Sequence, residues 1–363
     1  MNSPETYMMR CLELALLGAG HTAPNPMVGA VLVYEDRIIG EGYHRKHGEA
    51  HAEVNCIAAV KEEDRPFIPE ATLYVSLEPC AHHGKTPPCA DLVIEKRIPR
   101  VVIGCRDPFP QVNGKGIEKL LAAGVEVSLG VLERECIDLN RRFFTFNTLH
   151  RPFIVLKWAQ SANGRIAEIG QAPKTEGRQR SDGGAARTLI SNEYTNRLVH
   201  KWRSEEAAIL VGTRTALLDD PSLTVRLWKG PDPVRLVIDT TLRLPLGLKL
   251  FDGQGRTIVF NTIRHEEAGN PLYYQLATDS SLVQQIVVAL HRLKIQSVLV
   301  EGGARLLQSF IDEGTWDEAR VITNNELEIP GGLASPVLPD PVLRSRETIF
   351  SDTIRYYNNP TRT

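Results

Sequence analysis

Apolar positions follow two different periods in the first part of the chain. They recur at helical spacing in four segments, which predict helices at 7–17, 51–60, 88–95 and 117–123. Short apolar runs bounded by turn residues predict strands at 28–34, in a run ending at Gly40, and at 73–77, 101–105 and 125–129. Strands that alternate with helices predict an α/β domain of three layers, with helices on both faces of the sheet.

A second alternating pattern begins after Arg151-Pro152. We place the start of a new unit there, because a proline disfavours helix in the residue before it. Strands are predicted at 153–159, 207–212, 234–239, 257–261 and 297–300, and helices at 192–203 and 281–293. We therefore expect a junction within 139–151, between domains at 1–147 and 150–350. Segment 168–187 lacks periodicity, which predicts a mobile loop or disorder. The stretch from Gly331 onward shows no clear pattern.

Length and charge narrow the choice of function. The chain has 363 residues, more than one hydrophobic core usually supports, which agrees with two domains. The formal net charge is −2 and no dense block of Lys and Arg occurs, so nucleic acid is not expected as a partner. No apolar run reaches the roughly 18–20 residues that span a bilayer, and no secretory signal opens the chain. We therefore expect no membrane partner and a cytosolic location.

The cysteines point to a metal rather than to disulfides. A large chain without an export signal is expected to keep its thiols free. Cys11, Cys56, Cys105 and Cys136 fall in predicted helices or strands, where a buried thiol packs as a small apolar residue. Cys80 and Cys89 stand instead beside Pro79 and Pro88, at the ends of predicted elements.

His51-Ala52-Glu53, followed by Pro79-Cys80 and then Cys89, predicts a zinc site for hydrolytic deamination. Three protein ligands and one open position are typical of catalytic zinc, and His51, Cys80 and Cys89 provide that number. The metal lowers the pKa of a bound water to about 7 and so supplies the nucleophile. Glu53 would not bind the metal; we expect it to carry a proton to the substrate. Taken singly, each residue has an ordinary structural explanation, but the joint pattern favours the zinc site.

The chain resembles the bifunctional riboflavin-biosynthesis deaminase/reductase family over roughly residues 5–320. The resemblance rests on the segment from Thr22 to Gly29, on 51–54, and on the insert between Cys80 and Cys89. It implies a cytidine-deaminase-like three-layer α/β/α domain followed by a dihydrofolate-reductase-like α/β domain. The implied reactions are zinc-dependent deamination of a phosphoribosylated diaminopyrimidinone and NADPH-dependent reduction of its ribosyl group to ribityl. It also implies a homo-oligomer, either a dimer or a tetramer.

The resemblance assigns substrate contacts in the first domain to Asn25, His82, Lys85 and Asp107. An Asn amide can donate and accept hydrogen bonds, and a Lys ammonium suits a phosphate. Asn25 is also a plausible turn residue between two prolines, and Lys85 an ordinary exposed charge. The family usually has Asn where this chain has Phe109.

In the second domain the resemblance rests on short pieces of sequence at 156–157, 161–167, 208–213, 218–226 and 300–303. It implies catalytic roles for Lys157 and Asp220. Implied substrate contacts are Ser161, Ser191, Arg203, Leu223, Arg226 and Glu301, and implied cofactor contacts are Thr213, Gly302 and Gly303. Glycines at a helix start let backbone N–H groups approach a pyrophosphate, although a glycine pair is also common in tight turns. No G-x-G-x-x-G follows a predicted strand, so a Rossmann domain is not expected.

Two departures from the family pattern lie in this half. Asn163 stands where the family usually has Asp, and the segment 188–191 differs as well. Three alternatives therefore remain beside the bifunctional enzyme. They are a deaminase with a degenerate reductase domain, a nucleic-acid deaminase with a similar zinc site, and a scaffold in which zinc serves folding only.

Overall fold

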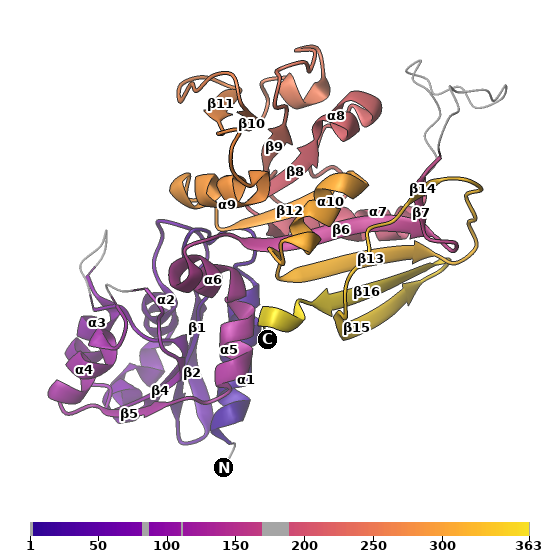
Figure 1. The fold of residues 1–363 in the computed structure, drawn as a ribbon. Helices are drawn as coiled ribbons and strands as arrows, with labels where there is room; N and C mark the ends of the chain where they lie inside the picture. The colour runs from indigo at the N-terminus through magenta and orange to yellow at the C-terminus, as the bar shows by residue number, and fades with distance from the viewer. Residues whose placement is uncertain (1–2, 82–86, 110–111, 169–188, 363) are drawn as a thin grey trace. The chain divides into compact units, whose positions relative to one another are not determined.

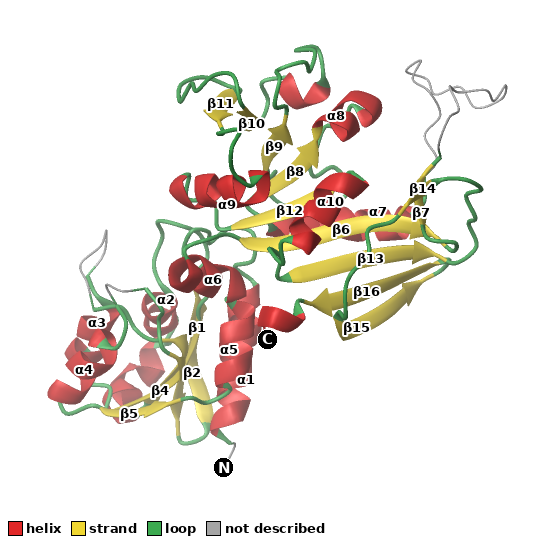
Figure 2. Cartoon of the chain, viewed as in Figure 1, coloured by secondary structure: helices red, strands yellow, loops and turns green. Residues whose placement is uncertain are grey.

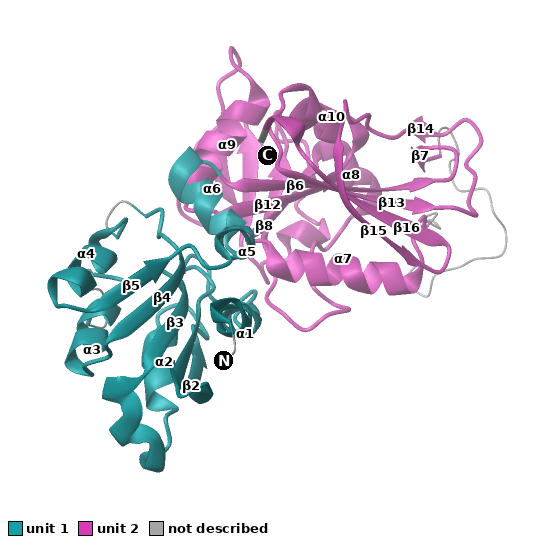
Figure 3. Ribbon diagram, turned by 90° about the horizontal axis from the view of Figure 1, so that it is seen from below, with its two compact units in different colours: residues 1–151 teal, residues 152–363 magenta. Residues whose placement is uncertain are grey.

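The computed structural model describes residues 3–81, 87–109, 112–168 and 189–362. The chain divides into two compact units, Met1–Arg151 and Pro152–Thr363 (Figure 3). Among the described residues, no helix has both the length and the apolar character needed to cross a membrane.

The first unit is built on a five-stranded sheet of order β2-β1-β3-β4-β5 (Figure 1). Strands β1, β2 and β3 pair antiparallel, whereas β3, β4 and β5 are parallel. Its strands are β1 (Gly29–Tyr34), β2 (Arg37–Tyr43), β3 (Thr72–Leu77), β4 (Arg100–Cys105) and β5 (Glu126–Leu129). Its helices are α1 (Pro4–Leu16), α2 (Ala52–Ala58), η1 (Glu62–Glu70), α3 (Cys89–Glu95), α4 (Lys115–Ala122), α5 (Glu133–Leu139) and α6 (Arg141–Leu149).

Two apolar cores cover the two faces of this sheet. Side chains of α2, α3 and α4 pack on one face, against residues such as Leu73 and Val75. Side chains of α1 and α5 pack on the other face, against residues such as Val31 and Tyr74. The predicted three-layer α/β/α domain is therefore confirmed.

Glycines in β2 let α2 lie unusually close to the sheet. A Cβ on Gly42 would lie 2.2 Å from the backbone nitrogen of Cys56, and one on Gly40 would lie 2.6 Å from the carbonyl oxygen of Cys56. Real side chains do not tolerate such distances, so both positions require glycine. This close approach matters because the first turn of α2 carries His51 and Glu53.

The second unit contains a nine-stranded sheet of order β11-β10-β9-β8-β12-β6-β13-β16-β15 (Figure 2). Strands from β11 to β13 in this order are parallel, and β16 and β15 add an antiparallel edge. The strands are β6 (Phe153–Ser161), β8 (Ala208–Gly212), β9 (Val234–Ile238), β10 (Thr257–Asn261), β11 (Leu272–Gln275), β12 (Ser297–Gly302), β13 (Glu318–Asn324), β15 (Val342–Ile349) and β16 (Asp352–Asn358). A separate pair is formed by β7 (Arg165–Ala167) and β14 (Leu333–Ala334).

Helices cover both faces of the large sheet. They are α7 (Glu193–Glu205), α8 (Thr213–Asp219), α9 (Leu282–Arg292) and α10 (Ala304–Asp312), with short 3₁₀ turns η2 (Lys249–Phe251) and η3 (Pro360–Arg362). Side chains of α9 and α10 pack against one face, together with Leu156 and Val300. Side chains of α7 and α8 lie on the opposite face, in two further cores.

The junction expected within 139–151 contains a helix, α6 at Arg141–Leu149, and the boundary between the two compact units follows Arg151. The stretch after Gly331 contains β15 and β16, and β16 lies between β13 and β15 in the sheet. Most of the loop expected at 168–187 lies outside the described residues.

Gly42→Ala is predicted to destabilise the first unit by about 1–3 kcal/mol, because the added methyl group forces α2 away from β2. Chemical denaturation followed by far-UV circular dichroism measures this change. Gly247→Ala is the control, because a Cβ at Gly247 meets no atom within 4 Å. Equal stabilities of the two variants would contradict the prediction.

Candidate active sites

Three sequence-predicted ligands converge in the first unit. His51 is the N-cap residue of α2, Cys80 follows β3, and Cys89 is the first residue of α3. Their ligand atoms all lie within 4.8 Å of one another. The Nδ1 atom of His51 is 3.6 Å from the Cys80 sulfur and 3.4 Å from the Cys89 sulfur.

These distances fit a tetrahedral zinc ion. With Zn–S bonds of about 2.3 Å and Zn–N bonds of about 2.0 Å, tetrahedral angles place the sulfur and nitrogen atoms about 3.5 Å apart. The thiol of Cys89 hydrogen-bonds to Cys80 and holds the pKa of Cys80 well below its ordinary range, with a smaller contribution from His51. The site therefore favours a thiolate, the form of cysteine that binds metals.

Glu53 lies in the first turn of α2 and is 3% exposed. Burial, and next the charge of Cys80, raise the pKa of Glu53 to about 7. Its carboxylate also takes part in a hydrogen bond with Cys89. A carboxyl group with a pKa near neutrality can both accept and release a proton, which a general acid–base group must do.

Glu78, which the sequence analysis did not single out, joins the metal loop to the next loop. It is buried, and its carboxylate accepts the backbone N–H groups of Asp107, Gly114, Gly116 and Ile117 at 2.9–3.3 Å. Asp107 and the start of α4 are thereby held beside the residues that follow β3.

Two predicted substrate contacts lie close to this centre. Asp107 is buried, and burial raises its pKa to about 7, with the charges of Glu78 and Cys80 acting in the same direction. The Asp107 carboxylate accepts the N–H of Phe109 at 2.8 Å, so the backbone of Phe109 contributes to this loop.

Asn25 is held by a histidine that the sequence analysis missed. The Nδ1 atom of His44 lies 3.1 Å from the carbonyl oxygen of Ala50 and must donate, so its Nε2 atom accepts from the Asn25 amide at 3.1 Å. The rings of His44 and His51 meet edge to face at 5.4 Å. Asn25 is therefore oriented beside the ligand set, whereas His82 and Lys85 lie outside the described residues.

The second unit contains a buried group of charges between its sheet and α7. Arg203 on α7 makes a two-pronged ion pair with Glu301 of β12, at 2.7 and 2.8 Å. Leu156 pairs with Val300, so the next residues, Lys157 and Glu301, point to the same face. Burial alone would raise the pKa of Glu301, but the charges of Arg203 and Lys157 lower it to about 2.

Arg226 reaches the same group from the segment that follows α8. Its pKa is lowered by burial and by the charge of Arg203, and its guanidinium donates to the Thr224 hydroxyl at 2.9 Å. In the described part of the chain, no carboxylate forms an ion pair with Arg226. Arg203 is already paired with Glu301, so Arg226 carries the uncompensated positive charge, which suits an anion such as a phosphate.

His200 was also missed by the sequence analysis. It is buried on α7, and its Nδ1 atom accepts the backbone N–H of Arg226 at 3.0 Å. Burial, and next the charges of Arg203 and Arg226, lower the pKa of His200 to about 4.

Three other predicted residues have partners of their own. Asp220, at the end of α8, accepts the N–H of Lys249 at 2.7 Å and lies 3.5 Å from its ammonium group. Ser161 is fully buried, donates to the Asn163 side chain at 2.6 Å and accepts the N–H of Arg165. Ser191 donates to the Asn196 side chain at 2.9 Å.

The predicted cofactor residues meet at the carboxyl ends of β8 and β12. Thr213 begins α8, and Gly302 and Gly303 precede α10. A Cβ on Gly302 or on Gly303 would lie 3.3 Å from the Thr215 hydroxyl, so the two helix starts are close together. The glycines leave room for a pyrophosphate against the N–H groups that open α10, which fits NADPH.

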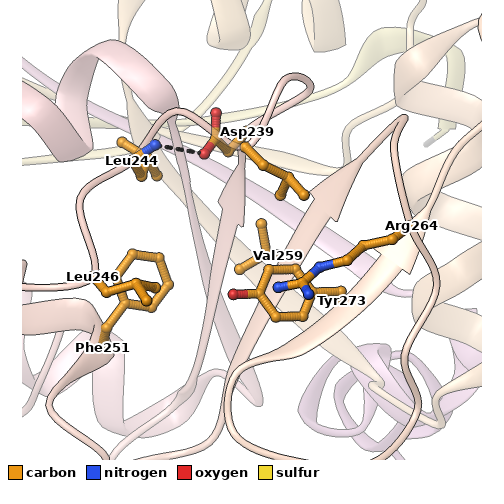
Figure 4. A pocket seen from close by; sticks show the side chains of 8 residues that line it. Asp239, Leu244, Leu246, Phe251, Val259, Arg264 and Tyr273 are labelled. Carbon is orange, nitrogen blue, oxygen red and sulfur yellow. Dashed lines mark hydrogen bonds between the residues drawn. The ribbon is translucent and has the colours of Figure 1, made fainter.

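A cavity of about 160 Å³ under β9, β10 and β11 contains none of the predicted residues (Figure 4). One Asp239 oxygen accepts the N–H of Leu244, and the other has no hydrogen-bond partner among the described residues. The guanidinium of Arg264 lies 3.7 Å over the Tyr273 ring. Leu246, Phe251 and Val259 line the remainder of the cavity wall, which is largely apolar.

The second unit is predicted to lose stability as the pH falls below about 6.5. His200 has a folded pKa of about 4 against an ordinary 6.5, so the unfolded chain takes up this proton first and stability falls between those values. Glu301 extends the loss from pH 4.5 toward about 2. All four tryptophans, at 158, 202, 228 and 316, belong to this unit, so urea unfolding followed by tryptophan fluorescence reports on it alone. His200→Asn should flatten the pH dependence above pH 4.5, and an unchanged slope would contradict the assignment.

Comparisons with known proteins agree with this geometry. Residues 1–105 match the cytidine and deoxycytidylate deaminase zinc-binding region, and residues 152–327 match the RibD C-terminal domain. Riboflavin biosynthesis protein RibD of Aquifex aeolicus is 40% identical over 318 residues, which cover 86% of this chain and 84% of that protein. RibD of Escherichia coli is 35% identical over 332 residues, with 86% and 85% covered.

Solved structures give the same result over almost the whole chain. The diaminohydroxyphosphoribosylaminopyrimidine deaminase/5-amino-6-(5-phosphoribosylamino)uracil reductase of Thermotoga maritima has a TM-score of 0.84 and 37% identity, with 98% of both chains covered. One crystal form of Acinetobacter baumannii RibD has a TM-score of 0.85 and 30% identity, again with 98% of both chains covered. The chain therefore belongs to the RibD family of bifunctional deaminase/reductases of riboflavin biosynthesis.

Proposed function

We propose that the two reactions of the family are divided between the two units. Residues 1–147 deaminate 2,5-diamino-6-ribosylamino-4(3H)-pyrimidinone 5′-phosphate, and residues 150–350 reduce the ribosyl group of the product to ribityl. The chain as a whole is a bifunctional enzyme of riboflavin biosynthesis that uses Zn²⁺ and NADPH. One observation above all supports this division of the two reactions: the first unit alone holds His51, Cys80 and Cys89 together, with the buried Glu53 beside them.

In deamination, His51, Cys80 and Cys89 hold the metal. Zinc, when bound, supplies the Lewis acid that makes water nucleophilic at neutral pH. Glu53 would take one proton from the attacking water and give it to the pyrimidine ring nitrogen; it would then take the remaining proton of the added hydroxyl and give it to the amine, which leaves as ammonia. Glu53 is buried away from bulk water, and burial raises its pKa to about 7, which suits a group that both accepts and releases a proton.

Substrate recognition in this unit is proposed to involve the ring and the phosphate separately. Asn25, oriented by His44, offers a donor and an acceptor to the pyrimidine or ribose, and Asp107 lines the same centre. The resemblance adds His82 to the pocket wall and places Lys85 at the ribose phosphate. A pocket that combines these groups suits a phosphoribosylated pyrimidine.

In reduction, the buried charges face the open-chain form of the sugar. NADPH, when bound, supplies the hydride. Lys157, held beside Glu301, stabilises charge that develops on the sugar hydroxyls. Asp220 assists protonation of the nitrogen and the ring oxygen that are bonded to the carbon that accepts the hydride. We assign the 5′-phosphate to Arg203 and Arg226, and the remaining substrate contacts to Ser161, Ser191, Leu223 and Glu301. Thr213, Gly302 and Gly303 are assigned to the cofactor.

Two broader properties are proposed from the family resemblance. The chain works as a homo-oligomer, a dimer or tetramer, which light scattering after size-exclusion chromatography tests directly. It works in the cytosol, where its six cysteines, all free in the structure, stay reduced. A nucleic-acid deaminase and a chain with a degenerate reductase half are not favoured, because relatives with both activities match most of the chain.

Glu53→Gln is predicted to lower the deamination rate at least 100-fold (order of magnitude) while zinc stays bound, because an amide cannot carry the proton. Release of ammonia measures the rate, and elemental analysis measures the metal. Reduction of separately supplied deaminated substrate is the control and should stay unchanged. Full deaminase activity of this variant would refute the role of Glu53.

Lys157→Met is predicted to lower NADPH oxidation about 100-fold or more, because the apolar side chain cannot stabilise charge on the sugar. Ammonia release by the same variant should equal that of the wild type. The pair Glu53→Gln and Lys157→Met thus separates the two activities. Loss of both activities in either single variant would contradict their division between the units.

A further inference from the structure

His200 is a buried titratable group that the mechanism above leaves without a role. It lies one turn before Arg203 on α7, and side chains three residues apart share a helix face. It is only 6% exposed, although a histidine usually keeps one ring nitrogen in water. Its position beside Arg203, Arg226 and Glu301 places it within the proposed reductase site.

The hydrogen bond of His200 defines its protonation. The Nδ1 atom accepts the N–H of Arg226, so it must carry no proton, and the ring proton resides on Nε2. The lowered pKa of His200 agrees with a neutral ring at physiological pH. A protonated ring would lose this contact, because imidazolium has no acceptor.

The partner of His200 belongs to a segment that has no regular secondary structure. In segment 223–226, Leu223 is buried with a φ of +55°, a conformation that is strained for a non-glycine residue. Side chains from outside hold the segment at three points. Arg203 donates to the Thr224 carbonyl at 3.3 Å, Asp232 accepts the N–H of Val225 at 2.6 Å, and His200 accepts the N–H of Arg226.

We infer that His200 is a positioning residue for substrate binding in the reductase unit, because it fixes the backbone from which Leu223 and Arg226 are presented. Of these three bonds, only the one to His200 engages the backbone of Arg226, whose guanidinium also donates to the Thr224 hydroxyl. Without the bond to His200, the Arg226 N–H is left unsatisfied and the guanidinium is no longer held beside Arg203. The inference rests on the proposed placement of reduction in the second unit.

The test compares His200→Ala, His200→Asn and His200→Gln in the full chain. In Asn the side-chain oxygen occupies the place of Nδ1, whereas in Gln it reaches toward the place of Nε2. We expect the Ala and Gln variants to raise the KM for the deaminated phosphoribosyl substrate about tenfold, the size of effect given by losing one buried hydrogen bond. Their kcat should stay within about twofold, and the Asn variant should restore the KM of the wild type.

The controls separate positioning from general damage. Ammonia release by each variant reports on the first unit and should be unchanged, and His265→Ala removes an exposed histidine of the same unit. If His200→Ala does not fold, the comparison of Asn with Gln decides alone. An unchanged KM in both Ala and Gln, or an Asn variant as impaired as Gln, would overturn the inference. Absence of NADPH oxidation by the wild type would instead refute the proposed function.

Discussion

Both sites depend on the cost of removing a carboxylate from water. A buried charge costs several kcal/mol unless partners replace its hydration. Glu78 meets this cost with four backbone N–H groups, and Glu301 with Arg203 and Lys157. Glu53 has fewer compensating partners, and its pKa rises to about 7. Glu78 and Glu301 therefore organise their surroundings through these partners, whereas Glu53 is able to exchange a proton.

The arrangement of the strands explains why these groups meet. In parallel strands the carboxyl ends lie along one edge of the sheet, and helices that follow them begin there with free N–H groups. Cys89 lies at the start of α3, and Gly302 and Gly303 lie just before α10. In each unit the candidate site residues thus lie at the carboxyl edge of the sheet, where the backbone N–H groups of helix starts are free to donate hydrogen bonds.

The sequence predicted the parts whose signal is local. Apolar runs located most parallel strands, and the spacing of His51, Cys80 and Cys89 located the metal ligands. The exposed strand β15 was missed because seven of its eight positions face solvent, which leaves no alternation to detect. Glu78 and His200 were missed for another reason. Their partners are backbone groups 26 to 39 residues away, and an amide N–H leaves no trace in residue type.

Asn163 shows how a departure from the family pattern can have a local compensation. Its side-chain oxygen accepts from the Ser161 hydroxyl and from the N–H of Ile329, while its NH₂ group donates to the Ile329 carbonyl. A carboxylate at this position would keep the first two contacts but would face the carbonyl oxygen without a proton to donate. The amide therefore suits the loop between β6 and β7 as this chain folds it. Since Asn163 ties Ser161 to that loop and does not touch the Arg203–Glu301 pair through any described hydrogen bond, the substitution leaves the buried charges of the reductase unit in place.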